Sequence, residues 1–344
     1  MHGGGAGAAP AIARAPVSST AMTPDEKARL VKRLAQEAGF DRAGITAPES
    51  SPHAAYYRDW LARGYAGSMS WLRRNVPQRE NPALLLPGTR SIVVVALNYR
   101  RAEDAPGDEP SGRVAQYARG RDYHEVLHER LAQLAAAMRE ALPEAFECRA
   151  CVDTAPLLER DLAASAGVGW VGKNTLILDQ RLGSYLFLGE LLTTLELTPD
   201  APISDHCGSC TRCLDACPTQ AFPEPYRMDA SRCIAYLTIE RRQDAPEALR
   251  AAIGDWVFGC DICQDVCPFN SRAPLGNDAD LAQPRIAGRI PLQKLTDMTA
   301  GDYRRLTRGT AARRATRAMW QRNARLALEN VQRRLTSADG DAVT

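Results

Sequence analysis

The segment CGSCTRCLDACP, residues 207–218, constrains the fold more than any other part of the chain. Its four cysteines follow the spacing C-x₂-C-x₂-C-x₃-C, and a proline comes directly after the last one. A run of this form supplies three thiolates to one [4Fe–4S] cluster, while its fourth cysteine binds a second cluster. The run is therefore only part of a site, and the remaining ligands must come from elsewhere in the chain.

A second run, CDICQDVCPFN at residues 260–270, also ends in a cysteine followed by proline. It has three cysteines, and Cys233 between the two runs completes the eight thiolates that two clusters need. Structural zinc or disulfides are the alternatives, but zinc sites usually come as separated CxxC pairs, and neither needs the CxxxCP endings. By analogy with two-cluster ferredoxins, we predict one cluster on Cys207, Cys210, Cys213 and Cys267 and another on Cys217, Cys233, Cys260 and Cys263.

With 344 residues the chain is long enough for two or three domains. No apolar run approaches the roughly 18–20 residues that a membrane-spanning helix needs. Residues 1–22 are rich in glycine and alanine and lack the apolar core of a secretory signal, so we expect a disordered tail, and Met22 is a second candidate start. Because clusters on thiolates imply a reducing compartment, the expected location is the cytoplasm.

Apolar periodicity predicts helices and strands that alternate along the first 200 residues. Helices are expected at 23–39, where Thr23 can act as the cap, and at 122–142 and 156–167. Strands are expected at 40–46, 91–100, 147–153 and 184–197. We therefore predict an α/β (α+β) domain at 23–200, a small ferredoxin-like two-cluster domain at 201–275, and a linker with an Arg-rich helical tail at 276–344.

The segment HEVLH, residues 124–128, matches the HExxH motif of zinc proteases, which places two histidines on one helix face. Here the match opens a predicted helix, where Asp122 can cap the helix and Glu125 can be its reciprocal partner. No glycine–histidine extension follows the motif. The helix-cap interpretation is therefore favoured over a metalloprotease.

The segment GVGWVG, residues 167–172, matches the dinucleotide-binding pattern GxGxxG. That pattern requires a strand before it and a helix after it. This copy follows a predicted helix and leads into residues 173–179, which read as extended. A loop that is mobile or lies close to a ligand fits better, because glycine permits close approach of the backbone.

Cys148 and Cys151 form a CxxC pair outside the cluster region. Strand positions three apart face opposite sides, so we expect two ordinary buried or half-buried thiols. Cys151 would share a face with Asp153. That aspartate has two open interpretations, as the cap of the following helix or as a catalytic group at the carboxyl end of a strand.

Taken together, these segments resemble the epoxyqueuosine reductases, cobalamin-dependent enzymes that complete queuosine synthesis in tRNA. The resemblance covers residues 23–275 and rests on YARGRDYH, CVDTAPLLERDLA, GWVGKNTLIL, SYLFLGELL, RCIAYLTIE and CDICQDVCPFN. It implies a catalytic domain similar to flavin-nitroreductase-like and cobalamin-processing folds. The implied reaction reduces epoxyqueuosine to queuosine at the wobble position of tRNA and releases the epoxide oxygen as water. A low-potential donor would supply electrons through both clusters to base-off cobalamin.

The resemblance also implies roles for individual residues. The family's proposed proton donor, an aspartate in the VDTAP segment, corresponds to Asp153. Its sequence neighbours are mostly apolar and include no cation, which predicts a partly dry pocket that raises the pKa of Asp153. The implied cofactor-pocket residues are Met69, Trp71, Tyr117, Asp122, Tyr123, His124, Asp153, Lys173, Asn174 and Ser184.

Residues 301–334 contain ten arginines and only two acidic residues, although the whole chain has a net charge of only +2. Arginine forks suit phosphate groups, so we predict that this tail contacts tRNA, with a solvated arginine face as the alternative. The tail is similar to a single helical repeat, and contacts made by the further repeats of many relatives would be missing. The chain is expected to be monomeric. The predicted tRNA contacts are Arg304, Arg305, Arg313, Arg314, Arg317 and Arg322.

Functions of other classes remain open. The same cofactors would serve a dehalogenase-like reductase of small molecules, and the clusters alone would serve an electron carrier. A carrier would not need a large domain before its clusters, and a small-molecule enzyme would not need an Arg-rich tail.

Overall fold

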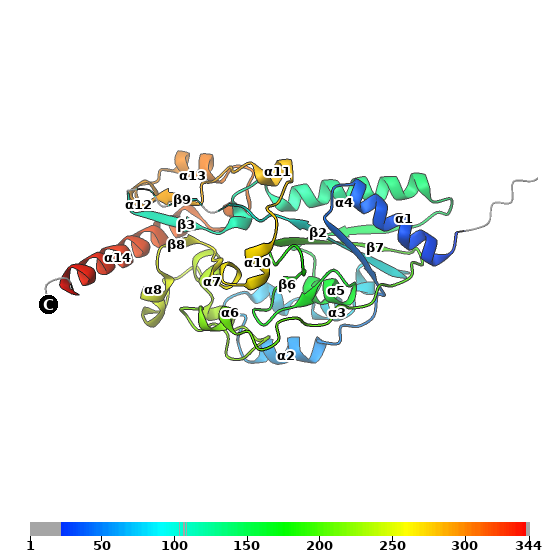
Figure 1. The fold of residues 1–344 in the computed structure, drawn as a ribbon, viewed down its shortest axis with the longest axis horizontal. Helices are drawn as coiled ribbons and strands as arrows, with labels where there is room; N and C mark the ends of the chain where they lie inside the picture. Colours follow the sequence, from blue (N-terminus) through cyan, green and yellow to red (C-terminus); the bar gives the residue numbers. More distant parts are fainter. Residues whose placement is uncertain (1–21, 103, 106, 108, 342–344) are drawn as a thin grey trace, which may run out of the picture.

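Figure 1 shows the computed structural model, which describes residues 22–102, 104, 105, 107 and 109–341. The predicted disordered tail lies outside this part of the chain, apart from Met22. None of the helices in the described part combines the length and the apolar character needed to cross a membrane.

The main sheet has four strands in the order β1–β2–β7–β4, and each neighbouring pair is antiparallel. The prediction of a mixed helix-and-strand fold is confirmed, and each strand lies within a segment predicted to be extended. The antiparallel order removes one argument for a catalytic Asp153, because the rule about carboxyl ends of strands concerns parallel sheets. The strands are β1 Arg42–Thr46, β2 Ser91–Asn98, β7 Leu186–Thr193 and β4 Cys148–Cys151.

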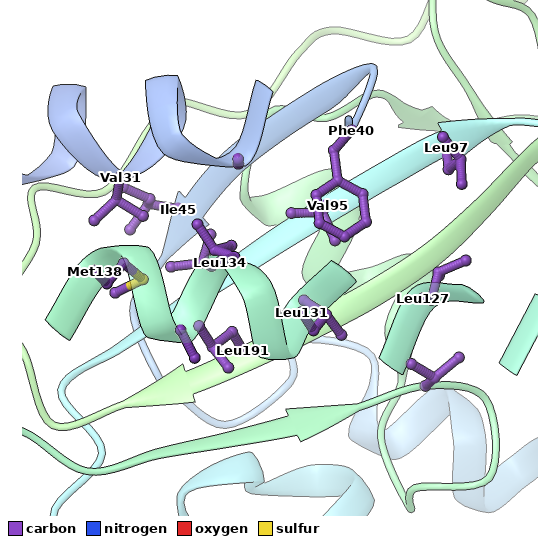
Figure 2. Packing of buried hydrophobic residues seen from close by; sticks show 14 of the residues in the cluster. Val31, Phe40, Ile45, Val95, Leu97, Leu127, Leu131, Leu134, Met138 and Leu191 are labelled. Carbon is purple, nitrogen blue, oxygen red and sulfur yellow. The ribbon is translucent and has the colours of Figure 1, made fainter. Parts of the chain in front are cut away.

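Strand β2 is buried along its whole length because helices cover both faces of the sheet. On one face Val93, Val95 and Leu97 pack beneath helices α1 (Pro24–Glu37) and α4 (Tyr123–Ala141), as Figure 2 shows for Val95 and Leu97. The side chains that α4 contributes to this core include Leu127, Leu131, Leu134 and Met138. On the other face Ile92, Val94 and Ala96 pack with residues of helix α5 (Glu159–Ser165).

The predicted helix starts are right in two cases and wrong in one. Thr23 and Glu26 form a capping box at the start of α1. Asp122 caps α4 by accepting a hydrogen bond from the backbone N–H of His124, but Glu125 forms an ion pair with Arg121 and no capping box. Helix α5 begins at Glu159, three residues after the predicted start, because residues 153–158 form an irregular loop.

A second sheet joins strands from distant parts of the sequence. Strand β3 (Ser111–Val114) pairs in parallel with β8 (Trp256–Phe258) and antiparallel with β9 (Arg289–Pro291). Helix α14 (Arg317–Asp341) packs against this sheet, and the fully buried Trp320 stacks on Phe258 with ring centroids 5.1 Å apart. The sheet and its core therefore connect all three of the predicted segments beyond residue 22.

The cysteine region is built largely from short helices, and a small hairpin from the preceding segment packs against it. Strands β5 (Trp170–Val171) and β6 (Ile177–Leu178) form the hairpin. The helices around the cysteines are α6 Arg212–Asp215, α7 Ile234–Ile239, α8 Glu247–Ile253, α9 Ile262–Asp265 and α10 Pro268–Arg272. The remaining α-helices are α2 Ala54–Ala62, α3 Val76–Glu80, α11 Ala279–Ala282, α12 Leu292–Thr296 and α13 Ala300–Thr307, and the 3₁₀ turns are η1 Ser70–Arg73, η2 Pro82–Leu85, η3 Gln116–Ala118, η4 Ala230–Arg232 and η5 Ala311–Arg314.

Candidate functional site

The eight cysteines predicted as cluster ligands fall into two neighbouring groups. Burial raises the pKa of the Cys213 thiol, and the nearby Cys267, Cys207 and Cys210 add to the shift, so that the pKa is about 11. These four are the first predicted ligand set. All ten cysteines of the chain are free thiols in the structure, including the half-buried Cys148 and the buried Cys151.

The second predicted set is grouped in the same way. Burial raises the pKa of the Cys260 thiol, with further contributions from Cys233 and Cys217. Burial also raises the pKa of the Cys263 thiol well above its usual range. The charges of Cys260 and Cys233 add to this shift, and Cys213 of the first set makes a smaller contribution. The two sets therefore lie close to each other, as electron transfer between two clusters requires.

The structure gives no support to a mononuclear metal site at the HEVLH segment. Both ring nitrogens of His124 face aspartates, while Glu125 and His128 are exposed. In the part of the chain that the structure describes, no three Cys, His, Asp or Glu side chains are placed to hold a single metal ion.

The GVGWVG segment leads into the β5–β6 hairpin and not into a nucleotide-binding helix. Gly172 lies at the point where the hairpin meets the first cysteine loop, and a Cβ atom there would come within 2.3 Å of Leu178 Cδ1 and 3.6 Å of Cys207 Sγ. Close packing therefore leaves no room for a side chain at position 172. The dinucleotide-binding interpretation is therefore wrong, while the expectation of a loop that is mobile or lies close to a ligand stays a prediction.

Lys173 and Asn174, at the hairpin tip, contact both cysteine loops. The buried Lys173 donates from Nζ to the carbonyl oxygens of Gly208, at 2.6 Å, and Cys210, at 3.0 Å. Asn174 Nδ2 donates to the carbonyl oxygen of Cys263, at 3.3 Å. These two predicted cofactor-pocket residues therefore lie beside the predicted cluster ligands.

Ser184 lies in the same region. Its hydroxyl donates to Gln264 Oε1, at 3.0 Å, and its backbone N–H donates to Asn270 Oδ1, at 2.7 Å. Both partners belong to the second cysteine run. Ser184 thus ties the start of β7 to this loop.

Asp153 lies just beyond β4 in a backbone conformation that is unusual for a residue with a side chain. Its φ of +47° falls in the left-handed region. The first residue of α5 is six positions further on, and the helix has no side-chain cap. The helix-cap interpretation of Asp153 is therefore wrong.

The surroundings of Asp153 also differ from the expected dry pocket without a cation. Its side chain is 54% exposed, and Oδ2 lies 3.2 Å from Nε2 of His124. Nδ1 of His124 lies 2.7 Å from Oδ1 of Asp122. Desolvation favours the neutral imidazole, but hydrogen bonds to Asp122 and Asp153 outweigh it and raise the pKa of His124 to about 9. A cation therefore does adjoin Asp153, and sequence proximity could not reveal it because His124 is 29 positions away.

Aromatic rings adjoin this Asp122–His124–Asp153 chain. The Tyr123 ring stacks on His124 with centroids 4.1 Å apart, and Tyr117 meets Tyr123 edge-on at 6.3 Å. Burial raises the pKa of both tyrosines, and the charge of Asp153 adds to the shift. Tyr117 and Tyr123 therefore lie close to Asp153, as the implied cofactor pocket requires.

Arg314 from the C-terminal segment approaches the same site. Its guanidinium lies 4.9 Å from the ring centroid of Trp71 and forms two hydrogen bonds with Glu240, at 2.8 and 2.9 Å. The hydrogen bonds to Glu240 raise the pKa of Arg314, and Asp153 and Tyr117 add to the shift. Met69 packs with Tyr117 and Cys260 against one core cluster, so this side of the site adjoins the second cysteine set.

Two further charged residues, Glu159 and Arg160, lie next to Asp153. Arg160 is exposed to water, yet the surrounding protein desolvates it enough to lower its pKa. Burial raises the pKa of the adjoining Glu159 to about 7, with Asp153 as the next contribution, and Glu159 Oε1 accepts a hydrogen bond from the backbone N–H of Asp153.

The six arginines predicted to contact tRNA have different surroundings. Arg304, Arg305 and Arg313 are exposed. Arg317 is exposed and donates to the Met298 carbonyl oxygen at 3.4 Å, and Arg314 belongs to the site described above. Arg322 is partly buried and donates to the carbonyl oxygens of residues 237, 241, 242 and 243, so it holds the end of α7 in place.

Sequence reasoning missed Glu159 and Arg160 beside Asp153, and it missed the buried Glu190 in the neighbouring core. Glu159 and Arg160 lie in the first turn of α5, directly after the irregular loop that begins at Asp153, and no periodicity marks them. Glu190 could have been noticed in the sequence, because it is a lone acidic residue inside the apolar run of strand β7. A charged residue in a buried strand calls for an explanation.

Two family models match the chain. The model "4Fe-4S double cluster binding domain" matches residues 206–270, which include all eight predicted ligands. The model "Epoxyqueuosine reductase QueG, DUF1730" matches residues 79–154 and ends just after Asp153. The first match favours iron–sulfur clusters over the zinc and disulfide alternatives.

Curated and solved relatives cover most of the chain. An epoxyqueuosine reductase from Xanthomonas campestris pv. campestris is 42% identical over 312 residues, which span 89% of this chain and 88% of the relative. A crystal structure of epoxyqueuosine reductase with an epoxyqueuosine-modified tRNA-Tyr stem loop has a TM-score of 0.82 and 33% identity, covering 88% of this chain and 80% of that chain.

A Bacillus subtilis epoxyqueuosine reductase, solved with its catalytic aspartate loop swung out of the active site, has a TM-score of 0.80 and 32% identity, covering 88% of this chain and 81% of that chain. These relatives share both the sequence and the architecture of the chain over nearly its whole described length. The chain therefore belongs to the epoxyqueuosine reductase family of oxidoreductases, and residues 206–270 form its double [4Fe–4S] cluster binding domain.

Proposed function

We propose that this chain reduces epoxyqueuosine to queuosine at the wobble position of tRNA and releases the epoxide oxygen as water. The observation that carries the proposal is the similarity, at a TM-score of 0.82, to a reductase solved with an epoxyqueuosine-modified tRNA stem loop. The arrangement around Asp153 supports it. A carboxyl group, a hydrogen-bonded histidine and aromatic rings lie together beside the second cysteine set.

The eight cysteines fit two [4Fe–4S] clusters, because they form two neighbouring sets of four. The residues around Asp153 fit base-off cobalamin: Tyr117, Tyr123 and Met69 offer apolar surface, and the nitrogens of His124 are engaged by aspartates and so do not serve as a cobalt ligand. When bound, cobalamin would supply a strongly reducing cobalt centre, and the clusters would supply one-electron transfer from a low-potential donor. The cobalamin pocket would be lined by Met69, Trp71, Tyr117, Tyr123 and His124.

In this proposal Asp153 is the general acid. Opening the epoxide places negative charge on its oxygen, and a carboxylic acid within hydrogen-bond reach lowers the barrier by protonating that oxygen. The His124 imidazolium donates to Asp153, and Asp122 fixes the imidazole from the other side. His124 therefore orients Asp153 and can return a proton to it between turnovers.

The substrate tRNA would lie across the exposed arginines of the C-terminal segment. Arg304, Arg305 and Arg313 are exposed, whereas backbone hydrogen bonds fix Arg322, so the guanidinium groups of the first three can reach phosphates. Arg314 and Trp71 at the edge of the site offer a stacking surface and a charge beside the modified base. We further propose that the protein acts in the cytoplasm, where thiolate-bound clusters persist.

The test is an anaerobic assay of the protein loaded with iron, sulfide and cobalamin. The loaded protein would be mixed with a low-potential reductant and with tRNA that carries epoxyqueuosine. The nucleosides would then be analysed by mass spectrometry. We expect conversion to queuosine only when both cofactors are present. Retention of stoichiometric flavin instead of cobalamin after gel filtration, or reduction of small substrates with intact tRNA left unchanged, would contradict the proposal.

A further inference from the structure

A basic segment runs from the end of helix α2 into helix α3. Residues 60–79 contain four arginines and no acidic residue, although the whole chain is nearly balanced, with 43 lysines and arginines and 41 aspartates and glutamates. Arg63 is compensated by an ion pair with Asp59, at 2.7 Å. Arg73 and Arg74 are exposed, and neither forms an ion pair with another described residue. These two adjacent guanidinium groups therefore carry positive charge without a local counterion.

Both arginines lie at the end of the 3₁₀ turn η1, whose backbone is held in place. Arg73 donates from Nη2 to the carbonyl oxygen of Leu61, at 2.8 Å. The backbone N–H of Arg74 donates to the carbonyl oxygen of Trp71, at 3.1 Å. Asn75 follows with a φ of +57°, in the left-handed region that asparagine tolerates better than most residues. The turn thus presents both arginines in a fixed position, which reduces the ordering cost of binding a ligand.

Trp71 places this turn beside the C-terminal segment. Its ring centroid lies 4.9 Å from the guanidinium of Arg314, the last residue of η5, and the preceding Arg313 is exposed. In Figure 1, α2 and α13, which precede the two turns in the sequence, lie at opposite edges of the molecule. The edge of the site at Trp71 is therefore the place where basic segments from two distant parts of the fold meet.

The chemistry of these arginines fits phosphate groups of an RNA backbone. A guanidinium fork can make two parallel hydrogen bonds to one phosphate. Base-off cobalamin also carries a phosphate group, but the two sources differ in their exposure to solvent. Met69, before the turn, is partly buried beside Tyr117, whereas Arg73 and Arg74, at its end, are exposed. This exposure favours a long, solvated RNA backbone over the phosphate of an enclosed cofactor.

We propose that Arg73 and Arg74 bind phosphate groups of the tRNA anticodon loop, so that the loop is held by both segments that meet at Trp71. The proposal rests on the proposed function. Neither arginine touches the reacting atoms, and both act by positioning the substrate. A loop held at one place can rotate about that contact, whereas a loop held at two places keeps the modified base in front of Asp153.

The test compares tRNA binding by the native protein, Arg74→Gln and the double variant Arg73→Gln/Arg74→Gln, all loaded with clusters and cobalamin. Isotherms for tRNA that carries epoxyqueuosine would be measured at several salt concentrations. Each lost phosphate contact should reduce the slope of log affinity against log salt by about 0.7–0.9 and weaken binding at roughly 0.1 M salt by about five- to eightfold. Arg74→Lys keeps the charge and should retain most of the slope. Arg33→Gln, at an exposed position on α1 and far from α13 in Figure 1, is the control and should have no effect.

Gel filtration followed by cobalt and iron analysis separates the two sources of phosphate. Both metals should remain at the native level in the double variant. Loss of cobalamin would overturn the proposal, because the arginines would then serve the cofactor, and an unchanged affinity and salt slope in the double variant would overturn it as well. If the native protein binds tRNA but leaves epoxyqueuosine unconverted, the proposed function fails, and the comparison of affinities still decides whether the two arginines bind RNA. A native protein that binds no tRNA would overturn both.

Discussion

Nε2 of His124 lies 3.2 Å from Oδ2 of Asp153, and this contact joins the start of helix α4 to the loop after strand β4. The imidazole is held from its other side by Asp122, so the ring has a fixed orientation in front of Asp153. Hydrogen bonds that favour the imidazolium raise the pKa of His124 to about 9 despite the opposing effect of burial. The free energy of unfolding should therefore change over the pH range in which His124 loses its proton.

The first prediction concerns that dependence. A histidine with a folded-state pKa of about 9 and an unfolded value near ~6.5 stabilises the fold fully below the lower value and loses this effect as pH rises through the upper one. We expect the free energy of unfolding to fall between about pH 6.5 and 9, by on the order of 1–2 kcal/mol after allowance for the exposure of Asp153. Denaturant titrations at several pH values would measure it. In His124→Gln this component should vanish, and an unchanged pH profile would contradict the assignment.

The second prediction concerns the cluster ligands. Because two clusters need eight thiolates, the reconstituted protein should carry about eight iron atoms per chain, and Cys233→Ala should lose about half of them. Cys148→Ala is the matched control, since Cys148 lies outside both sets and should leave the iron content unchanged. Iron analysis and anaerobic absorption spectra would measure both variants. A full iron complement in Cys233→Ala would show that the ligand assignment is wrong.

The third prediction concerns Lys173, whose ammonium group lies against the carbonyl oxygens of the first cysteine loop. A nearby positive charge stabilises the reduced, more negative cluster, so it should raise the reduction potential. Lys173→Met should shift the potential of one cluster to more negative values and leave the other nearly unchanged. Redox titration followed by electron paramagnetic resonance would resolve the two. The exposed Lys294→Met is the control, and equal shifts in both variants would refute a local effect.

The sequence predicted the features that depend on spacing and periodicity. The eight thiolates, the strand at 91–98 and the capped helices follow from patterns that local chemistry imposes. It did not predict the contact between His124 and Asp153 or the approach of Arg314 to Trp71, because these depend on how distant segments pack. The sequence also did not predict the antiparallel order of the main sheet, because strand direction depends on the connections between strands.

The fourth prediction distinguishes three exposed arginines, of which Arg305 forms an ion pair with Asp302, from Arg322, which backbone hydrogen bonds hold in place. Reversing Arg304, Arg305 and Arg313 to glutamate should weaken tRNA binding and reduce its salt dependence, with the log–log slope falling by up to about one for every phosphate that these arginines neutralise. The fold should remain intact because all three are exposed. Binding isotherms at several salt concentrations would measure the effect. Arg322→Ala should instead lower thermal stability, because it removes hydrogen bonds to the end of α7. Salt-insensitive binding by the native protein would count against this surface.

The last prediction concerns Asp153 itself. Asn keeps the size of the side chain and can still accept a hydrogen bond from His124, but it has no acidic proton to give. Asp153 caps no helix, so Asp153→Asn should retain its fold, both clusters and bound cobalamin. Turnover of epoxyqueuosine tRNA should fall by about 10²–10⁴-fold, the usual contribution of a general acid. Thr154→Ala, a change at the neighbouring exposed position, serves as the control for the loop. Mass spectrometry of the nucleosides would measure both rates. Near-normal turnover by Asp153→Asn would transfer the role of proton donor to another group, with His124 as the first candidate because its imidazolium adjoins Asp153.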